Sequence, residues 1–429
     1  MLTVIFISLF VFFLIGVPIA FSIGLASVAS LLIEDPALLI SAPQRIFVMC
    51  DSFPIMALPF FILAGEIMSR GGISDRLVRL SQILVSNFRA GLAMAAVVAC
   101  MIFAGISGSA AADASAIGAI IIPAMLAKRY KKGFVASLMA SASSIGPIIP
   151  PSMIMIVYSS LTGVSIAAMF LGGVVPGFMI GGALMLLVFI YSYRKGYGFL
   201  SEKTGSFSWA ALWDAFKGAF FALLTPVIIF FGIIGGIFTA TEAGVVASVY
   251  ALLVSMFIYR TTKLRDLPSI LVDAMVITCQ VMIIVAMAGL FGWLLAKNLF
   301  HEHLITFLYG ISSNPHVILL VMIVFLLILT MFVEGLAALI ILAPVLAQLG
   351  TALNMHPIHF GVTIVLAMMI GAVTPPVGVL LFITTSLARA DFREVWKSCY
   401  PFILALMAVL FTVAYIPILV TWLPDLVMK

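Results

Sequence analysis

The chain has 429 residues, of which 64% are hydrophobic and only 9% are charged. A soluble domain carries about 25% charged residues, so this composition excludes an ordinary water-soluble protein. The net charge of +5 comes from lysines and arginines in short loops, which is typical of membrane proteins and does not indicate nucleic-acid binding. Apolar runs of about 20 residues recur from end to end, without the alternation of a barrel strand. We therefore expect an all-α polytopic membrane protein.

The first apolar segment covers residues 2–34. Gly16-Val17-Pro18 can turn the chain there, so we expect two helices, at about 2–16 and 18–34. The segment has no positive n-region and no Ala-x-Ala site, which favours a membrane helix that stays attached over a cleaved signal peptide. Further helices, up to residue 70, complete this first group.

Residues 88–128 are apolar except for a stretch of small and polar residues, 105–113. Arg89 lies at the start of the segment and Lys128 at its end, and the positive-inside rule places both in the cytoplasm. Two full spans would satisfy this rule and put the polar stretch at the far surface. We favour a re-entrant hairpin, with its tip inside the protein at mid-membrane depth.

The next segment, 134–161, is interrupted at 146–152 by Gly-Pro-Ile-Ile-Pro-Pro-Ser. Three prolines in five residues remove hydrogen-bond donors and clash with preceding carbonyls, so a helix cannot continue. The carbonyl groups before the break lose their partners and become available to a cation. We therefore expect a discontinuous helix, followed by a single span at 166–193.

The second half repeats this order. An amphipathic segment, 208–216, is expected to lie along the membrane interface as an arm. Further spans follow up to residue 296, and then a hairpin at 316–350, a broken helix at 358–388 and a span at 400–424.

The two breaks share the pattern Gly-x-x-x-Pro-Pro, which starts at Gly146 and again 225 residues later at Gly371. No strong basic cluster flanks the second hairpin, which suits the opposite side of the membrane. We therefore expect two inverted repeats, 1–205 and 206–429, with both termini in the periplasm. Paired interrupted helices in inverted halves are typical of secondary transporters and indicate where their binding site lies.

Several motifs resemble the large membrane subunit of TRAP (tripartite ATP-independent periplasmic) transporters, over essentially the whole chain. They are Asp51-Ser52-Phe53-Pro54, the segments 59–65, 105–113 and 146–152, and Thr374-Pro375-Pro376. The resemblance implies an elevator-type fold of the ion transporter superfamily in the bacterial inner membrane. It also implies sodium-driven import of an organic acid such as a C4-dicarboxylate, sialic acid or another sugar acid.

The resemblance further implies two partner proteins, a small four-helix membrane subunit and a periplasmic substrate-binding protein. Because Met1 opens directly on the first large-subunit helix, we expect the small subunit to be a separate chain. The implied coupling ion, Na⁺, is a hard cation and prefers oxygen ligands.

The positions of the motifs and the resemblance together give candidate sites. Sodium ligands are expected in the first half at Gly105, Ser107, Ser109, Gly146, Ile149 and Pro150, and in the second half at Glu334, Gly335, Gly371, Thr374 and Pro375. Helix N-termini after Ser109 and Pro151 carry partial positive charge and could hold a substrate carboxylate. The expected substrate-binding residues are therefore Ser109, Asp113, Pro151 and Ser152.

Each polar candidate has a structural alternative. Ser107 and Ser109 could be small packing residues. Asp113 could be a buried N-cap of the second hairpin arm, and Glu334 could cap a helix in the same way.

Two other functions compete with transport. A channel for ions or anions with re-entrant loops is the main alternative, but inverted halves argue against it. The sequence has no nucleophile–base motif for an intramembrane enzyme and no phosphate-binding Gly-x-x-x-x-Gly-Lys-Ser/Thr for ATP. We therefore expect neither catalysis nor ATP as the energy source.

Overall fold

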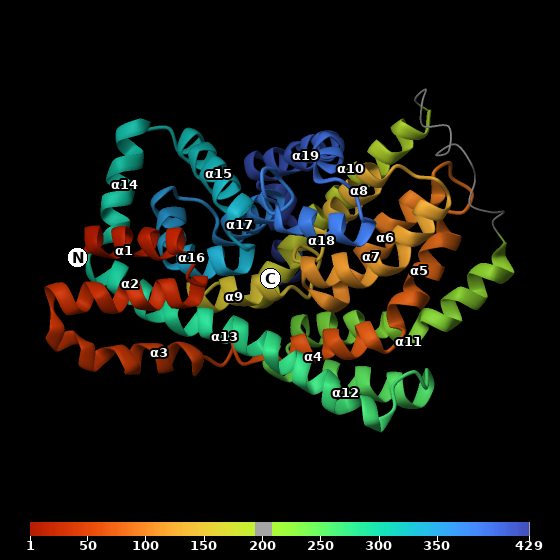
Figure 1. The fold of residues 1–429 in the computed structure, drawn as a ribbon, viewed down its shortest axis with the longest axis horizontal. Coiled ribbons are helices and arrows are strands. Elements are labelled where there is room, and N and C mark those ends of the chain that lie inside the picture. Colours follow the sequence, from red (N-terminus) through yellow and green to blue (C-terminus); the bar gives the residue numbers. More distant parts are fainter. Residues whose placement is uncertain (194–207, 429) are drawn as a thin grey trace.

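The structure of the chain is a computed structural model that describes residues 1–193 and 208–428 (Figure 1). The regular secondary structure within these ranges is helical, so the expected all-α class is confirmed. Seven of the described helices are long and apolar enough to cross a membrane. The chain is therefore a multi-pass membrane protein, as its composition predicts.

The N-terminal helices lie at one end of the molecule and along one side of it (Figure 1). They are α1 (Leu2–Ile15), α2 (Ile19–Glu34), α3 (Ala42–Cys50), α4 (Ala57–Arg70) and α5 (Ile73–Leu84), with a 3-10 turn, Pro36–Ser41, before α3. Gly16 ends α1 in the left-handed region, at φ 85°, and Pro18 directly precedes α2. The predicted turn within residues 2–34 is therefore confirmed.

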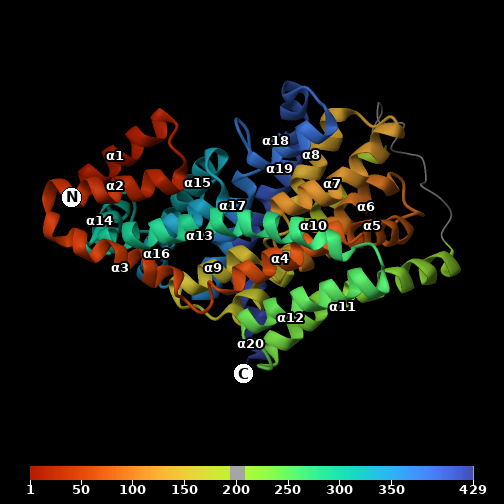
Figure 2. The same cartoon turned by 60° about the horizontal axis from the view of Figure 1, so that its bottom comes forward.

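The next five helices carry the first hairpin and the first break. They are α6 (Gly91–Ser107), α7 (Ala110–Ala127), α8 (Lys132–Ser143), α9 (Met153–Thr162) and α10 (Ile166–Tyr193). α6, α7 and α8 each contact the other two and form a group in the half of the molecule away from the N-terminus, on the right in Figures 1 and 2.

Four helices follow, α11 (Trp209–Ile234), α12 (Ala240–Leu253), α13 (Leu267–Lys297) and α14 (Phe300–Ile311). A short π turn, Val254–Ile258, extends α12. α13 runs along much of the length of the molecule and contacts α2, α3, α4 and α16 (Figure 2). It thereby joins the N-terminal helices to the second hairpin.

The segment 208–216, expected as an arm along the membrane interface, does not form a helix of its own. Trp209 to Phe216 are the first turns of α11, which continues without interruption to Ile234. The alanine, leucine and lysine residues around this junction favour a helix, so α11 continues through it. Asp214 also pairs with Arg79 of α5 at 2.9 Å, which ties this end of α11 to the neighbouring helix.

The last helices are α15 (Pro315–Phe332), α16 (Gly335–Ala352), α17 (Pro357–Gly371), α18 (Val379–Ala388), α19 (Phe392–Tyr415) and α20 (Ile418–Val427). The single span predicted at 400–424 is wrong in its bounds. α19 begins earlier because Asp391 caps it, accepting a 2.9 Å bond from Arg393 N, and it ends before Pro417.

The two halves interlock around the breaks. α7 and α8 of the first half contact α18 of the second, and α9 contacts α16 and α17. Both hairpins and both breaks therefore meet in the middle of the molecule (Figure 1).

Candidate functional site

The first hairpin turns at Gly108 and Ser109. Gly108 ends α6 with φ 58°, a conformation that favours glycine, and the chain reverses there. The Ser109 hydroxyl accepts a 3.4 Å bond from Ala112 N and so caps α7. Asp113 is not the cap of this helix, so that alternative reading of Asp113 is wrong.

The first break, residues 144–152 between α8 and α9, lies against this turn. Ser152 caps α9 by accepting a 3.2 Å bond from Met155 N, and its hydroxyl donates to the Pro147 carbonyl at 2.5 Å. A Cβ atom added to Gly108 would stand 2.7 Å from the Pro151 carbonyl oxygen. Glycine is therefore needed at the tip to let hairpin and break approach this closely.

Asp113 lies between the hairpin and the break, and its side chain is fully buried. The Ser107 hydroxyl donates to Oδ1 of its carboxylate, whereas Oδ2 has no hydrogen-bond partner within residues 1–193 and 208–428. A Cβ atom on Gly146 would stand 2.5 Å from this unpaired oxygen. A charged group this deep in an apolar protein is costly unless a cation or a donor compensates it, so the free oxygen marks a candidate cation position.

The second hairpin and the second break meet in a similar way. Glu334 caps α16 by accepting a 2.9 Å bond from Ala337 N, as the structural alternative anticipated. Gly378 N, just after the break, donates a 3.0 Å bond to the Met331 carbonyl at the end of α15. Gly371 packs against the Thr330 hydroxyl group, which reaches the break from α15.

Thr374 lies within the second break, and its hydroxyl donates a 2.7 Å bond to the Ile370 carbonyl. One carbonyl at this break is therefore already satisfied by a side chain. The Pro375–Pro376 peptide bond is cis, as is Pro150–Pro151 in the first break.

A cavity of about 70 Å³ lies between the two hairpin tips. Gly108, Ser109 and Pro147 line it from the first half, and Glu334 and Gly335 line it from the second. This volume is small for an organic acid. In this structure the hairpins are therefore closed on each other.

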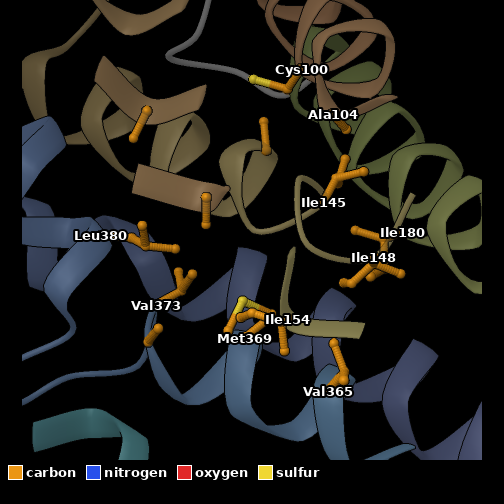
Figure 3. Close-up of a cluster of buried hydrophobic side chains, with 14 of the residues drawn as sticks. Cys100, Ala104, Ile145, Ile148, Ile154, Ile180, Val365, Met369, Val373 and Leu380 are labelled. Carbon is orange, nitrogen blue, oxygen red and sulfur yellow. The ribbon is translucent and has the colours of Figure 1, made fainter. Parts of the chain in front are cut away.

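Buried apolar side chains surround the breaks and fix their shape. Figure 3 shows Ile148 and Val373, one from each break, together with Ile154 of α9, Met369 of α17 and Leu380 of α18. All of them are at most 5% exposed. The polar backbone at the breaks is thus held in a closely packed apolar surrounding, where a bound ion would be shielded from water.

The predicted residues of the first half are brought together. Gly105 lies beside the Pro150 carbonyl, with a 3.4 Å distance for an added Cβ, and the contacts above join Ser107, Ser109, Asp113 and Gly146. The Ile149 side chain instead packs against Gly177 of α10. In the second half, Glu334 and Gly335 reach the cavity, whereas Gly371 contacts α15.

Two further residues contribute to these sites and were not among the candidates expected from the sequence, Pro147 and Thr330. The Pro147 carbonyl accepts from Ser152, and Thr330 supplies the hydroxyl beside Gly371. Of these two residues, only Thr330 could have been identified from the sequence. It is a hydroxyl residue in a long apolar run, one turn before the polar interruption at Glu334.

Residues 6–419 match the sequence family described as "Tripartite ATP-independent periplasmic transporter, DctM component". The chain belongs to this family. The resemblance seen in the motifs is thereby confirmed.

Permeases of TRAP transporters from other bacteria match this chain over almost its whole length. The C4-dicarboxylate TRAP transporter large permease protein DctM of Vibrio cholerae is 37% identical over 97% of this chain and 95% of that protein. The sialic acid TRAP transporter large permease protein SiaM of the same species is 34% identical over 96% and 95%. The isethionate TRAP transporter permease protein DctMQ of Oleidesulfovibrio alaskensis is 37% identical over 95% of this chain and 64% of that longer protein. The family consists of transporter permeases, so the chain is not an enzyme.

Proposed function

We propose that this TRAP permease imports an organic acid, a C4-dicarboxylate, sialic acid or another sugar acid, by coupling its uptake to sodium. Relatives named for C4-dicarboxylates and for sialic acid support this substrate class. A small four-helix membrane subunit and a periplasmic substrate-binding protein would complete the transporter in the bacterial inner membrane. The single observation that supports the sodium coupling is the carboxylate oxygen of Asp113 beside Gly146, which no described residue pairs.

The first sodium position is assigned to this contact. A sodium ion there would compensate a negative charge on Asp113, and the Ser107 hydroxyl, which contacts the same carboxylate, offers a neutral oxygen. Asp113 was also expected to bind the substrate, but its negative charge suits a cation better than a substrate carboxylate. The second sodium position is assigned to the break around Gly371 and Thr374, beside Thr330.

The substrate position is assigned to the cavity between the hairpin tips. The N-termini of α7 and α9 begin beside it, after Ser109 and Ser152, and helix N-termini favour anions. Because the cavity is small, substrate binding requires the tips to separate. We therefore assign Glu334 and Gly335 to a movable wall of the site.

The proposed mechanism is an elevator, in which the hairpins and breaks move across the membrane against the remaining helices. Two features support it: each half carries a hairpin followed by a broken helix, and each hairpin lies on the break of its own half. The inverted repeats 1–205 and 206–429, with periplasmic termini, belong to the same proposal.

Uptake by the reconstituted transporter tests this function. With its small subunit and binding protein, the chain should accumulate the organic acid only under an inward sodium gradient. Uptake that is unchanged when potassium replaces sodium would overturn the proposal. A channel with re-entrant loops, the alternative function, would instead give downhill flux that needs neither the gradient nor the binding protein.

A further inference from the structure

The ends of two helices that flank the breaks meet at one corner of the fold, where α8 begins and α18 turns into α19. The backbone N–H of Gly133, in the first turn of α8, donates a 3.1 Å bond to Glu394 Oε1. Lys132 Nζ donates a 2.9 Å bond to the carbonyl of Arg389, the residue that follows α18. Each half of the chain therefore caps a helix end that belongs to the other half.

Both bonds satisfy groups that a helix cannot satisfy by itself. The first N–H groups and the last carbonyl groups of any helix lack partners within it. Lys131, which precedes α8, makes no side-chain cap for this helix. An anion is favourable at a helix N-terminus and a cation at a C-terminus, which is the arrangement of Glu394 and Lys132.

The contact between α8 and α19 leaves no room for a larger residue at position 133. A Cβ atom on Gly133 would stand 2.8 Å from each of three atoms, Glu394 Cγ, the Glu394 carbonyl oxygen and Ser398 Oγ. One turn further along α8, the fully buried Ser137 donates a 3.0 Å bond to the Val395 carbonyl. α8 is thus bound to α19 along the whole of its first turn.

The corresponding corner on the other side of the breaks is open. There, the end of α9 and the beginnings of α10 and α17 border a cavity of about 450 Å³, lined among others by Thr162, Ser165 and Pro357. Ser165 caps its own helix, at 3.3 Å from Ala168 N, and His356 makes no side-chain cap for α17. The two corners therefore differ, and only the one at Gly133 is closed by reciprocal caps among the described residues.

We propose that Glu394 and Lys132 are positioning residues, which fix the beginning of α8 and thereby hold Gly146, beyond its other end, against Asp113. α8 has 12 residues and acts as a rigid rod of about 18 Å. A displacement at Gly133 is therefore transmitted to the break. The inference rests on the proposed function, in which the contact between Asp113 and Gly146 forms a sodium position.

The sodium dependence of uptake by the complete reconstituted transporter tests the role of Glu394. Glu394→Ala should raise the sodium concentration for half-maximal uptake by roughly three- to tenfold, because it removes one charge-assisted helix cap. Glu394→Gln should stay close to wild type, because its amide oxygen accepts the same bond. A fall in the maximal rate or in the yield of folded protein, with unchanged sodium half-saturation in Glu394→Ala, would overturn the proposal.

Hydrogen exchange of the purified chain provides a second test that does not depend on sodium coupling. Glu394→Ala should speed amide exchange in α8 and also in the break at 144–152, whereas Glu394→Gln should not. Faster exchange confined to the first turn of α8 would show that the cap is only local and would refute the positioning role. If wild-type uptake proves independent of sodium, the proposed function fails. The exchange experiment then still tests whether Glu394 positions α8 and the break.

Discussion

Gly146 lies so close to Asp113 that a Cβ atom on the glycine would stand 2.5 Å from the carboxylate oxygen Oδ2. The two residues belong to different elements, the first break and the second arm of the first hairpin. Because Oδ2 has no hydrogen-bond partner among the described residues, the break and the hairpin enclose an oxygen with which a further group, such as a cation, can pair. Substitutions of these two residues therefore test the proposed sodium position in the first half of the chain.

Gly146→Ala should abolish sodium-dependent uptake, because its methyl group would occupy the space against Asp113. Overpacking of this kind costs about 1–3 kcal/mol and displaces either the hairpin or the break. Uptake by the reconstituted transporter over a range of sodium concentrations measures the effect. Gly182→Ala is the matched control, since a Cβ atom there meets nothing within 4 Å in a helix of the same half. Equal loss in both variants would contradict the prediction.

Asp113→Asn should weaken sodium binding while keeping the fold. The asparagine has nearly the same shape and still accepts from Ser107, but it lacks the charge that attracts the ion. The loss should be about 1.5–3 kcal/mol, or roughly ten- to hundredfold in sodium affinity.

A ligand that binds only the folded state raises thermal stability, so the melting temperature in detergent measures this loss without transport. Wild type should melt at a higher temperature in sodium than in potassium, and Asp113→Asn should lose most of this difference. An unchanged difference in the variant would assign the ion to another position.

The positions of the breaks are predictable from the sequence because their cause is local. Proline lacks a backbone donor, so any helix that reaches Pro147 or Pro150 must end, whatever surrounds it. The composition predicts a membrane protein for a similar reason, because it depends on which residues are present and not on how they contact one another.

The contacts that build the site are not local, and the sequence therefore did not reveal them. Ser107 reaches Asp113 only because Gly108 turns the chain at φ 58°, and nothing in the residue types specifies which neighbouring polar residue caps α7. Gly133 and Glu394 are 261 residues apart, so no periodicity or motif connects them. The continuation of the helix beyond the segment 208–216 was missed because the amphipathic character of this segment does not show where its helix ends.

Gly108→Ala should destabilise the hairpin tip more than a comparable glycine substitution elsewhere. Alanine at φ 58° costs about 1 kcal/mol or more, and its Cβ would also stand 2.7 Å from the Pro151 carbonyl. Gly16→Ala separates the two effects, because Gly16 has φ 85° but open space around it. We expect a lower melting temperature in both variants and loss of uptake only in Gly108→Ala. Normal uptake in Gly108→Ala would show that the tip does not depend on this contact.

Ser109→Cys should react with water-soluble thiol reagents only when the hairpin tips separate. In this structure Ser109 lines a cavity of about 70 Å³, which a bulky reagent cannot enter. The measurement needs a background without the native cysteines, Cys50, Cys100, Cys279 and Cys399. Labelling should change between sodium, sodium with substrate, and potassium. The same low labelling in every condition would indicate that Ser109 only packs and caps α7.

A cross-link between Ser52 and Ser160 should arrest transport. Their hydroxyl groups are 3.1 Å apart and join the loop before α4 to α9, that is, a proposed static part to a proposed moving part. A Ser52→Cys/Ser160→Cys pair, in the cysteine-free background, should form a disulfide under mild oxidation and lose uptake, and reduction should restore it. Each single variant, treated in the same way, controls for the substitutions. If the oxidised pair still transports at the wild-type rate, α9 does not move against the loop, and the elevator assignment of these elements is wrong.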